Sequence, residues 1–220
     1  MAAEPLPSPD AAARERAKRK AQSRAFWLRQ MRQWHWISAA ICLVGMLLFS
    51  ATGITLNHAA QIPAEPKVET RTAPLPGPVR APLAGEDGTR PAPEPVARWL
   101  KSELGVEAAG REAEWSADEV YLALPRPGGD AWVSIDRATG AVEHETTSRG
   151  WIAYLNDLHK GRNTGPAWAW FIDIFAAASI LFSITGLVLL QLHAAQRRIT
   201  WPLVGLGVVV PLLVLMFLIH

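Results

Sequence analysis

Two short segments of similar sequence each end in a histidine, and they are the part of the chain best suited to chemistry. Residues 49–58 read Phe-Ser-Ala-Thr-Gly-Ile-Thr-Leu-Asn-His, and residues 182–193 read Phe-Ser-Ile-Thr-Gly-Leu-Val-Leu-Leu-Gln-Leu-His. Both segments contain the pattern Phe-Ser-x-Thr-Gly-x-x-Leu and lie where a long apolar run gives out. Ionisable side chains are rare in membrane spans and usually mark function there. His58 and His193 are therefore candidate ligands.

Histidines on facing helices of a membrane bundle favour the binding of a b-type haem. Each axial position of the iron takes one imidazole nitrogen, and the apolar shell around the macrocycle tunes its potential. Gly186 and Ser179 lie close to the helical stripe of His193, where small residues let a flat macrocycle or a partner helix approach. The histidines could instead bind copper or iron ions, although no Met or Cys accompanies them as copper would prefer.

Three apolar segments must position these histidines. They run from about residue 36 to 57, from 167 to 192 and from 201 to 219, and a bilayer core takes about 20 apolar residues to cross. Tryptophans, which are typical of the membrane interface, precede the first two segments. No small-residue cleavage site ends the first segment, so we predict a retained helix rather than a secretory signal peptide.

The uneven distribution of charge predicts an orientation. Residues 1–33 hold eight Lys or Arg against three acidic residues, and Arg197 and Arg198 follow the second span. The positive-inside rule places these basic segments in the cytoplasm and residues 59–166 outside it. A formal net charge of +2 argues against a nucleic-acid partner, which would require a concentrated basic face. Cys42 is the single cysteine, so no intrachain disulfide can form.

This orientation sorts the histidines near the spans into two layers. His35 and His193 share the cytoplasmic edge, whereas His58 and His159 share the outer edge, which His220 also reaches. His35 and His58 are 23 residues apart, roughly 35 Å along a helix, so they cannot share one haem. The sequence predicts one or two haems held by His58 with His159 and by His35 with His193. The outer pair ranks first because its flanking sequences are more specific, and His220 is an alternative outer ligand.

The segment between the first two spans predicts a small polar module. Residues 59–95 contain nine prolines, and we expect an extended, semi-rigid linker because proline interrupts helices and central strands. Residues 96–150 contain a short amphipathic helix that stops at Gly105, followed by three segments that alternate like strands. We expect one helix on a three-stranded antiparallel sheet. His144, between two glutamates, is expected to be solvated.

The order of several motifs resembles that of the PepSY-associated transmembrane helix family, over about residues 26–220. The first is His35 with the segment 49–58. The next are Val133-Ser-Ile-Asp-Arg-Ala-Thr-Gly140, which resembles a turn of the PepSY module, and Leu155-Asn-Asp-Leu-His-Lys-Gly161, which resembles the Leu-His-x-Gly that precedes a span. The last is Phe-Ser-Ile-Thr-Gly at 182–186.

The resemblance implies a mainly α membrane protein with three transmembrane helices. A small α+β, PepSY-like periplasmic module is inserted between the first two, and the membrane is the inner membrane of a bacterium. Some members of that family are haem-containing reductases that pass electrons to periplasmic ferric siderophores or other acceptors. By resemblance, the haem b ligands are His35, His58, His159 and His193. No Gly-rich dinucleotide fingerprint is present, so the chain is not expected to take hydride from NAD(P)H itself.

The expected organisation has eight segments. They are a basic cytoplasmic N-terminal segment (1–33), a first transmembrane helix (34–58), a Pro-rich linker (59–95), the PepSY-like module (96–150), an amphipathic interfacial helix (151–165), a second transmembrane helix (166–193), a cytoplasmic loop (194–200) and a third transmembrane helix (201–220).

Two other functions stay open at this stage. Histidines at span boundaries also serve as interfacial polar caps, and Ser-x-Thr-Gly also favours helix packing. The spans would then only anchor a non-enzymatic module that binds or regulates a periplasmic partner. A metal-handling accessory subunit is the third function. The expected partners are membrane lipid and a periplasmic or membrane redox protein, with a homo-oligomer as a further option.

Overall fold

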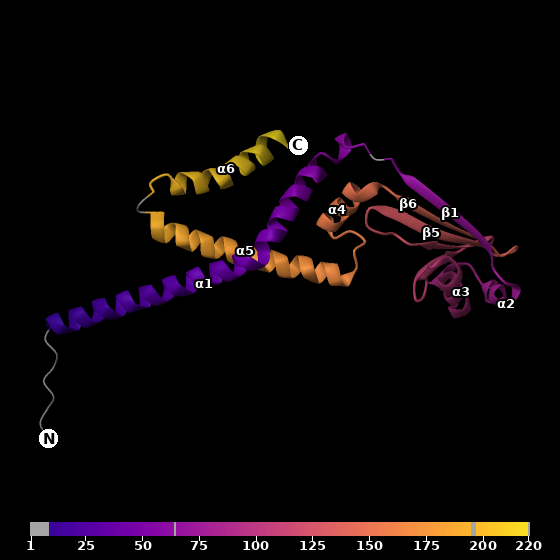
Figure 1. Ribbon diagram of the computed structural model, residues 1–220, viewed down its shortest axis with the longest axis horizontal. Coiled ribbons are helices and arrows are strands. Elements are labelled where there is room, and N and C mark those ends of the chain that lie inside the picture. Colours follow the sequence, from indigo (N-terminus) through magenta and orange to yellow (C-terminus); the bar gives the residue numbers. More distant parts are fainter. Residues whose placement is uncertain (1–8, 64, 195–196, 220) are drawn as a thin grey trace, which may run out of the picture. The chain divides into compact units, whose positions relative to one another are not determined.

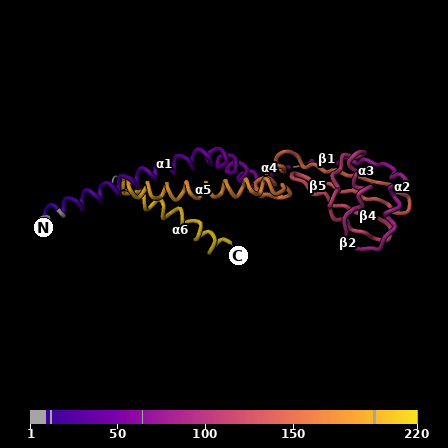
Figure 2. Tube along the Cα trace, turned by 90° about the horizontal axis from the view of Figure 1, so that it is seen from below, coloured from indigo at the N-terminus to yellow at the C-terminus, as the bar shows by residue number. Residues whose placement is uncertain are grey.

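The computed structural model describes residues 9–63, 65–194 and 197–219. The chain forms two compact units, Met1–Leu47 with Asp173–His220, and Leu48–Ile172. Helices α1 (Pro9–Asn57) and α5 (Pro166–His193) each contribute to both units. Figures 1 and 2 label both helices. The functional residues are therefore described separately for each unit.

Three helices are long and apolar enough to cross a membrane, Ala13–Asn57, Pro166–His193 and Thr200–Leu218. The last of these is α6. This confirms the prediction of three membrane helices. Most of their large apolar side chains are exposed on the protein, which is expected for side chains that face lipid. A helix can span the lipid because it satisfies its backbone hydrogen bonds internally.

Helix α1 is one continuous helix of 49 residues. It begins at Pro9 and so includes most of the segment 1–33, which we expected to be separate from the first transmembrane helix; residues 1–8 lie outside the described residues. Residues 11–25 consist of Ala, Arg, Lys, Glu and Gln with a single Ser, and the first five of these types are strong helix formers. The basic segment is therefore a helical extension of the first span.

The second unit contains a six-stranded antiparallel sheet with the order β1-β6-β5-β4-β3-β2. Figure 1 labels β1, β6 and β5. Its strands are β1 (Lys67–Pro74), β2 (Gly88–Pro91), β3 (Glu112–Trp115), β4 (Glu119–Ala123), β5 (Gly129–Asp136) and β6 (Ala141–Ser148).

The predicted three-stranded sheet was too small. The three expected strands are β4, β5 and β6, and β3 was missed. Strands β1 and β2 lie in the segment predicted to be a linker, so that prediction was wrong for them. Both are edge strands, and each ends at a proline, Pro74 or Pro91. Proline is tolerated in edge strands because it need not donate to a ladder there.

Helix α3 (Glu94–Leu104) covers one face of the sheet (Figure 1). It ends at Gly105, which has a φ of 70°, as the sequence predicts. Its buried residues include Val96 and Leu100, which join a core with buried side chains from the central strands, among them Val120, Leu122, Val133, Ile135 and Val142. The strands bury alternate residues toward α3, as in β5, where Val133 and Ile135 are fully buried.

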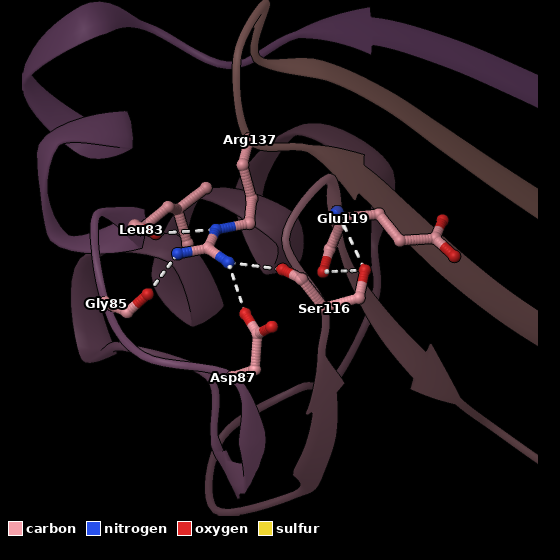
Figure 3. Close-up of polar contacts among 6 residues, drawn as sticks. All are labelled: Leu83, Gly85, Asp87, Ser116, Glu119 and Arg137. Atoms are coloured by element: carbon pink, nitrogen blue, oxygen red, sulfur yellow. Dashed lines mark hydrogen bonds and ion pairs between the residues drawn. The ribbon is translucent and has the colours of Figure 1, made fainter.

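Arg137, which follows β5, joins the segment before β2 to the sheet (Figure 3). Its guanidinium donates to the carbonyl oxygens of Leu83 (3.0 Å), Gly85 and Ser116 and lies 3.2 Å from the Asp87 carboxylate. Its side chain is only 13% exposed.

The turn that follows β5, at residues 136–140, is stabilised by Asp136. The Asp136 carboxylate accepts hydrogen bonds from the Thr139 amide and hydroxyl. Those two bonds lower the pKa of Asp136.

His144 differs from the expectation that it is solvated. It is half-buried in β6, beside Val133 on one neighbouring strand and Arg71 on the other. Its Nδ1 atom is buried and has no hydrogen-bond partner within the described residues. Burial lowers the pKa of His144, and the charges of Arg71 and Arg126 lower it further. The two flanking glutamates do not indicate that His144 is solvated, because alternate residues of a strand point to opposite faces.

Candidate functional site

In the first unit, His35 on α1 is held by the second Phe-Ser-x-Thr-Gly segment, on α5. Its Nδ1 atom lies 3.2 Å from the Phe182 carbonyl oxygen and 3.1 Å from the Thr185 hydroxyl. Its imidazole stacks on the Phe182 ring, with centroids 4.5 Å apart and planes inclined by 16°. A Cβ atom at Gly186 would lie 3.3 Å from Cε1 of His35. The glycine therefore lets the imidazole lie against α5.

These contacts determine which nitrogen of His35 carries the proton. A carbonyl oxygen only accepts, and the Thr185 hydroxyl already donates to the Leu181 carbonyl at 2.7 Å. Nδ1 of His35 is therefore the donor to both oxygens, and in the neutral imidazole the lone pair is on Nε2. A metal-ligating histidine commonly donates its other ring N–H to a carbonyl in this way, which fixes its orientation.

In the second unit, the first Phe-Ser-x-Thr-Gly segment holds His159 by an equivalent set of contacts. Nδ1 of His159 lies 2.7 Å from the Thr52 hydroxyl, which itself donates to the Leu48 carbonyl at 2.9 Å. The Phe49 ring lies 5.0 Å from the imidazole, and a Cβ at Gly53 would be 3.6 Å from Cε1 of His159. With the Thr52 hydroxyl donating to Leu48, Nδ1 of His159 donates to that hydroxyl, and in the neutral imidazole the lone pair is again on Nε2.

Helix α4 (Gly150–Lys160) positions His159. The Thr55 hydroxyl near the end of α1 donates to the Asn156 side chain at 2.8 Å. The amide of Gly128, just before β5, donates to the Asp157 carboxylate at 2.8 Å. Both α4 side chains are buried. Helix α4 is thus fixed to the end of α1 and to the sheet within the same unit.

The two segments therefore act as equivalent clasps. In each clasp a phenylalanine contacts the imidazole ring, a threonine hydroxyl accepts a hydrogen bond from Nδ1, and a glycine allows the imidazole to approach the helix closely. We had assigned to each segment the histidine that follows it, and missed that each holds a distant one. The sequence pattern does indicate a binding face on each helix, because Phe, Thr and Gly at positions i, i+3 and i+4 share one helix face.

His58 and His193, the histidines that follow the segments, bond to their own helices. Nδ1 of His58 lies 3.0 Å from the Ile54 carbonyl, and Nδ1 of His193 lies 2.8 Å from the Leu189 carbonyl. Both side chains are exposed. Since a carbonyl only accepts, these two histidines also carry the proton on Nδ1 and leave Nε2 available.

His35 and His193 line one cavity of about 750 Å³ in the first unit. Its walls include apolar side chains such as Phe182 and Leu190, and Arg197 also lines it. The volume lies within the usual range of cofactor and ligand sites, about 300–1,000 Å³.

The outer pair is not brought together in the same way. No hydrogen bond or ring contact joins His58 to His159 in the described part of the chain, and His220 lies outside the described residues. The geometry therefore favours His35 with His193 over the outer pair, which we had ranked first from the sequence.

The comparison with protein families decides the membership of this chain. The family model described as PepSY_TM-like matches residues 26–220. The chain belongs to the PepSY_TM-like family. This confirms the resemblance found in the sequence, and the match includes both clasp segments and the sheet. Neither the curated proteins nor the solved structures gave a match.

The cavity of this PepSY_TM-like chain suits a haem in its donor set and its volume. Two imidazoles line it, and each has its Nδ1 atom bonded to a backbone carbonyl, which leaves Nε2 for the bis-histidine ligation of iron. Gly186 adds no side chain where it lines the cavity beside His35. His35 and His193 would hold the group, and the apolar walls would enclose the macrocycle.

Proposed function

We propose that this chain is a haem b protein of the bacterial inner membrane that passes electrons to a periplasmic acceptor. Reduction of a ferric siderophore or another form of ferric iron is the reaction that it would serve. The observation that most directly supports this proposal is the cavity shared by His35 and His193. When bound, haem b supplies reversible one-electron transfer at its iron.

The protein residues have distinct roles in this proposal. His35 and His193 give their Nε2 atoms to the iron, and the carbonyls that accept their Nδ1 protons make both imidazoles more basic ligands. Thr185 and Phe182 fix the plane of the His35 ring, and the apolar walls keep water from the macrocycle. A second haem would use His159, with His58 as its other ligand.

The proposed orientation rests on charge. Residues 1–33 and the loop with Arg197 and Arg198 are basic, which favours the cytoplasmic side, where the leaflet is anionic. The sheet and α4 would then lie in the periplasm. The four histidines would form one cytoplasmic and one periplasmic layer.

Absorbance of the purified full-length protein tests the haem proposal. Protein from haem-replete cells should show a Soret band and reduced α band typical of a bis-histidine haem. His35→Ala and His193→Ala should each remove the signal of the first-unit site, whereas the module variant His144→Ala should keep it. If His159→Ala alone abolishes the spectrum, the outer pair holds the haem, and a colourless wild-type protein excludes the proposal.

The acceptor is tested in a second experiment. Dithionite-reduced protein in detergent is mixed with a ferric hydroxamate siderophore, and the α band is followed in a stopped-flow instrument. Reoxidation that depends on siderophore concentration supports a ferric reductase. A reduced spectrum that persists under anaerobic conditions would point to another acceptor.

A second candidate function, binding of a partner by the module, is favoured by the sheet face opposite α3. Residues of this face alternate with the buried ones, and none of them in the six strands is Lys or Arg. At its centre Tyr121 and Trp132 stack with ring centroids 6.0 Å apart. The acidic residues of the face are Glu112, Glu114, Glu119, Asp130, Asp136, Glu143 and Glu145.

A protein with a basic surface is the partner that this face would attract, because complementary charge speeds association and fixes orientation. An Arg-rich peptide is a suitable probe, since guanidinium groups also bind aromatic faces. Binding should weaken with salt and with Glu143→Gln/Glu145→Gln. A colourless protein that binds the peptide in this manner would favour the partner-binding function over the haem proposal.

A further inference from the structure

Arg197 is the one formally charged residue among the described residues that line the cavity of His35 and His193. No carboxylate forms an ion pair with it within the described part of the chain. The described lining of the cavity thus combines apolar walls, two imidazoles and one guanidinium without a carboxylate partner. Such a site suits a ligand with a flat apolar body and an anionic edge.

We propose that Arg197 binds a haem propionate and sets the edge of the macrocycle that faces the loop between α5 and α6. This inference rests on the haem function proposed above. A guanidinium presents a planar fork that matches a carboxylate with two parallel hydrogen bonds. Haem carries two carboxylates on one edge, and the cavity supplies a cation only at Arg197.

The backbone around Arg197 is held in place. Its amide donates to the Ala194 carbonyl at 2.9 Å, and its carbonyl accepts from the Thr200 amide at 3.1 Å. The Trp201 indole donates to the Gln191 side chain at 2.9 Å, which joins the start of α6 to α5. Arg197 is therefore anchored on both sides while its side chain reaches the cavity.

The adjacent Arg198 provides a matched control. It has the same charge and is also exposed, but it is absent from the cavity lining. A general electrostatic effect of the basic loop would be lost equally in Arg197→Gln and Arg198→Gln. A specific contact with the propionate would be lost in Arg197→Gln alone.

The experiment titrates haem, and separately haem dimethyl ester, into apo full-length protein in detergent, and follows the Soret band. Arg197→Gln should weaken haem binding by about tenfold, the loss expected for one charged contact of about 1.4 kcal/mol. Its affinity for the dimethyl ester, which lacks both negative charges, should equal that of wild type. Arg198→Gln should behave as wild type with both ligands, and Arg197→Lys should recover part of the lost affinity.

The outcomes separate the two proposals. Equal haem affinity in wild type and Arg197→Gln overturns the role of Arg197 while the haem function stands. An equal loss for haem and for the dimethyl ester shows a structural defect and also overturns it. Wild-type protein that binds neither ligand overturns the haem function itself, and circular dichroism with size-exclusion chromatography confirms that each variant is folded.

Discussion

The Thr185 hydroxyl lies 3.1 Å from Nδ1 of His35, although the two residues are 150 positions apart in the chain. Thr185→Val keeps the side-chain shape and removes this acceptor, while the Phe182 carbonyl remains. We expect haem affinity at the first-unit site to fall about tenfold, the lower end of the effect of removing such a supporting hydrogen bond. Haem titration of the apo protein measures it.

Thr52→Val is the matched control for that variant, because Thr52 holds His159 in the other unit. If only the first-unit site binds haem, Thr52→Val should leave the affinity unchanged. Unchanged affinity in Thr185→Val would contradict the role that we assign to the clasp of His35.

Gly45 permits close packing of α1 against α5 within the first unit. A Cβ atom at this position would lie 2.5 Å from Cε2 of Phe175, so Gly45→Ala must displace the ring or separate the helices. We expect a net loss of up to about 2 kcal/mol, since overpacking costs about 1–3 kcal/mol and alanine regains about 1 kcal/mol of helix propensity. The thermal midpoint of the protein in detergent should fall.

Gly207→Ala provides the control for Gly45→Ala, because nothing lies within 4 Å of a Cβ atom at Gly207. Its thermal midpoint should equal or exceed that of wild type. A similar loss in both variants would show that helix packing at Gly45 is not the cause.

Arg137 should contribute strongly to the stability of the sheet unit. Arg137→Ala leaves three carbonyl oxygens and the Asp87 carboxylate without their donor, and hydrogen bonds to charged groups are worth about 1.5–3 kcal/mol each. We expect a loss on the order of 3 kcal/mol in the denaturant unfolding of the second unit, monitored by tryptophan fluorescence. Arg98→Ala, which breaks an exposed pair with Glu94, should cost below about 1 kcal/mol.

His144 should make the sheet unit less stable at mildly acidic pH. Its pKa is lowered in the folded protein from an ordinary value of 6.5, so the unfolded chain takes up the proton first as the pH falls. Stability is therefore full above about pH 6.5 and declines below it. Denaturant unfolding at pH 7.5 and 5.5 should show this decline in wild type and a smaller one in His144→Gln.

Asp136 does not interfere with the His144 measurement. Its pKa is also lowered, from an ordinary value of 3.8. The stability that it contributes is present above that value and is lost only as the pH falls further. A decline between pH 7.5 and 5.5 of equal size in wild type and His144→Gln would show that His144 is not its source.

The sequence predicted the elements whose residues repeat with a clear period. The spans follow from long uncharged apolar runs, and α3 follows from its amphipathic spacing and Gly105. Strands β4 to β6 alternate apolar and polar residues because one face packs on α3. Strand β1 has no such alternation, since only Ala73 among its residues is partly buried. Its backbone pairing with β6, which the sequence does not reveal, makes it part of the sheet.

The site could be predicted in part. The candidate histidines were found because ionisable residues at the ends of apolar runs are conspicuous. Their pairing was not found, because each clasp joins residues more than 100 positions apart, and no local pattern encodes such a contact. Arg197 was interpreted only as an orientation signal, since its position at the cavity depends on how the chain folds after α5.

The separation of His35 from its clasp has a consequence for biogenesis. During synthesis α1 is made first, and the Phe182 carbonyl follows 147 positions later in the chain, after every strand of the sheet. A nascent chain therefore carries His35 without its clasp until α5 has been synthesised. The cavity that His35 and His193 line therefore cannot form before α5 is synthesised, and a chain truncated before residue 182 would contain the sheet without this cavity.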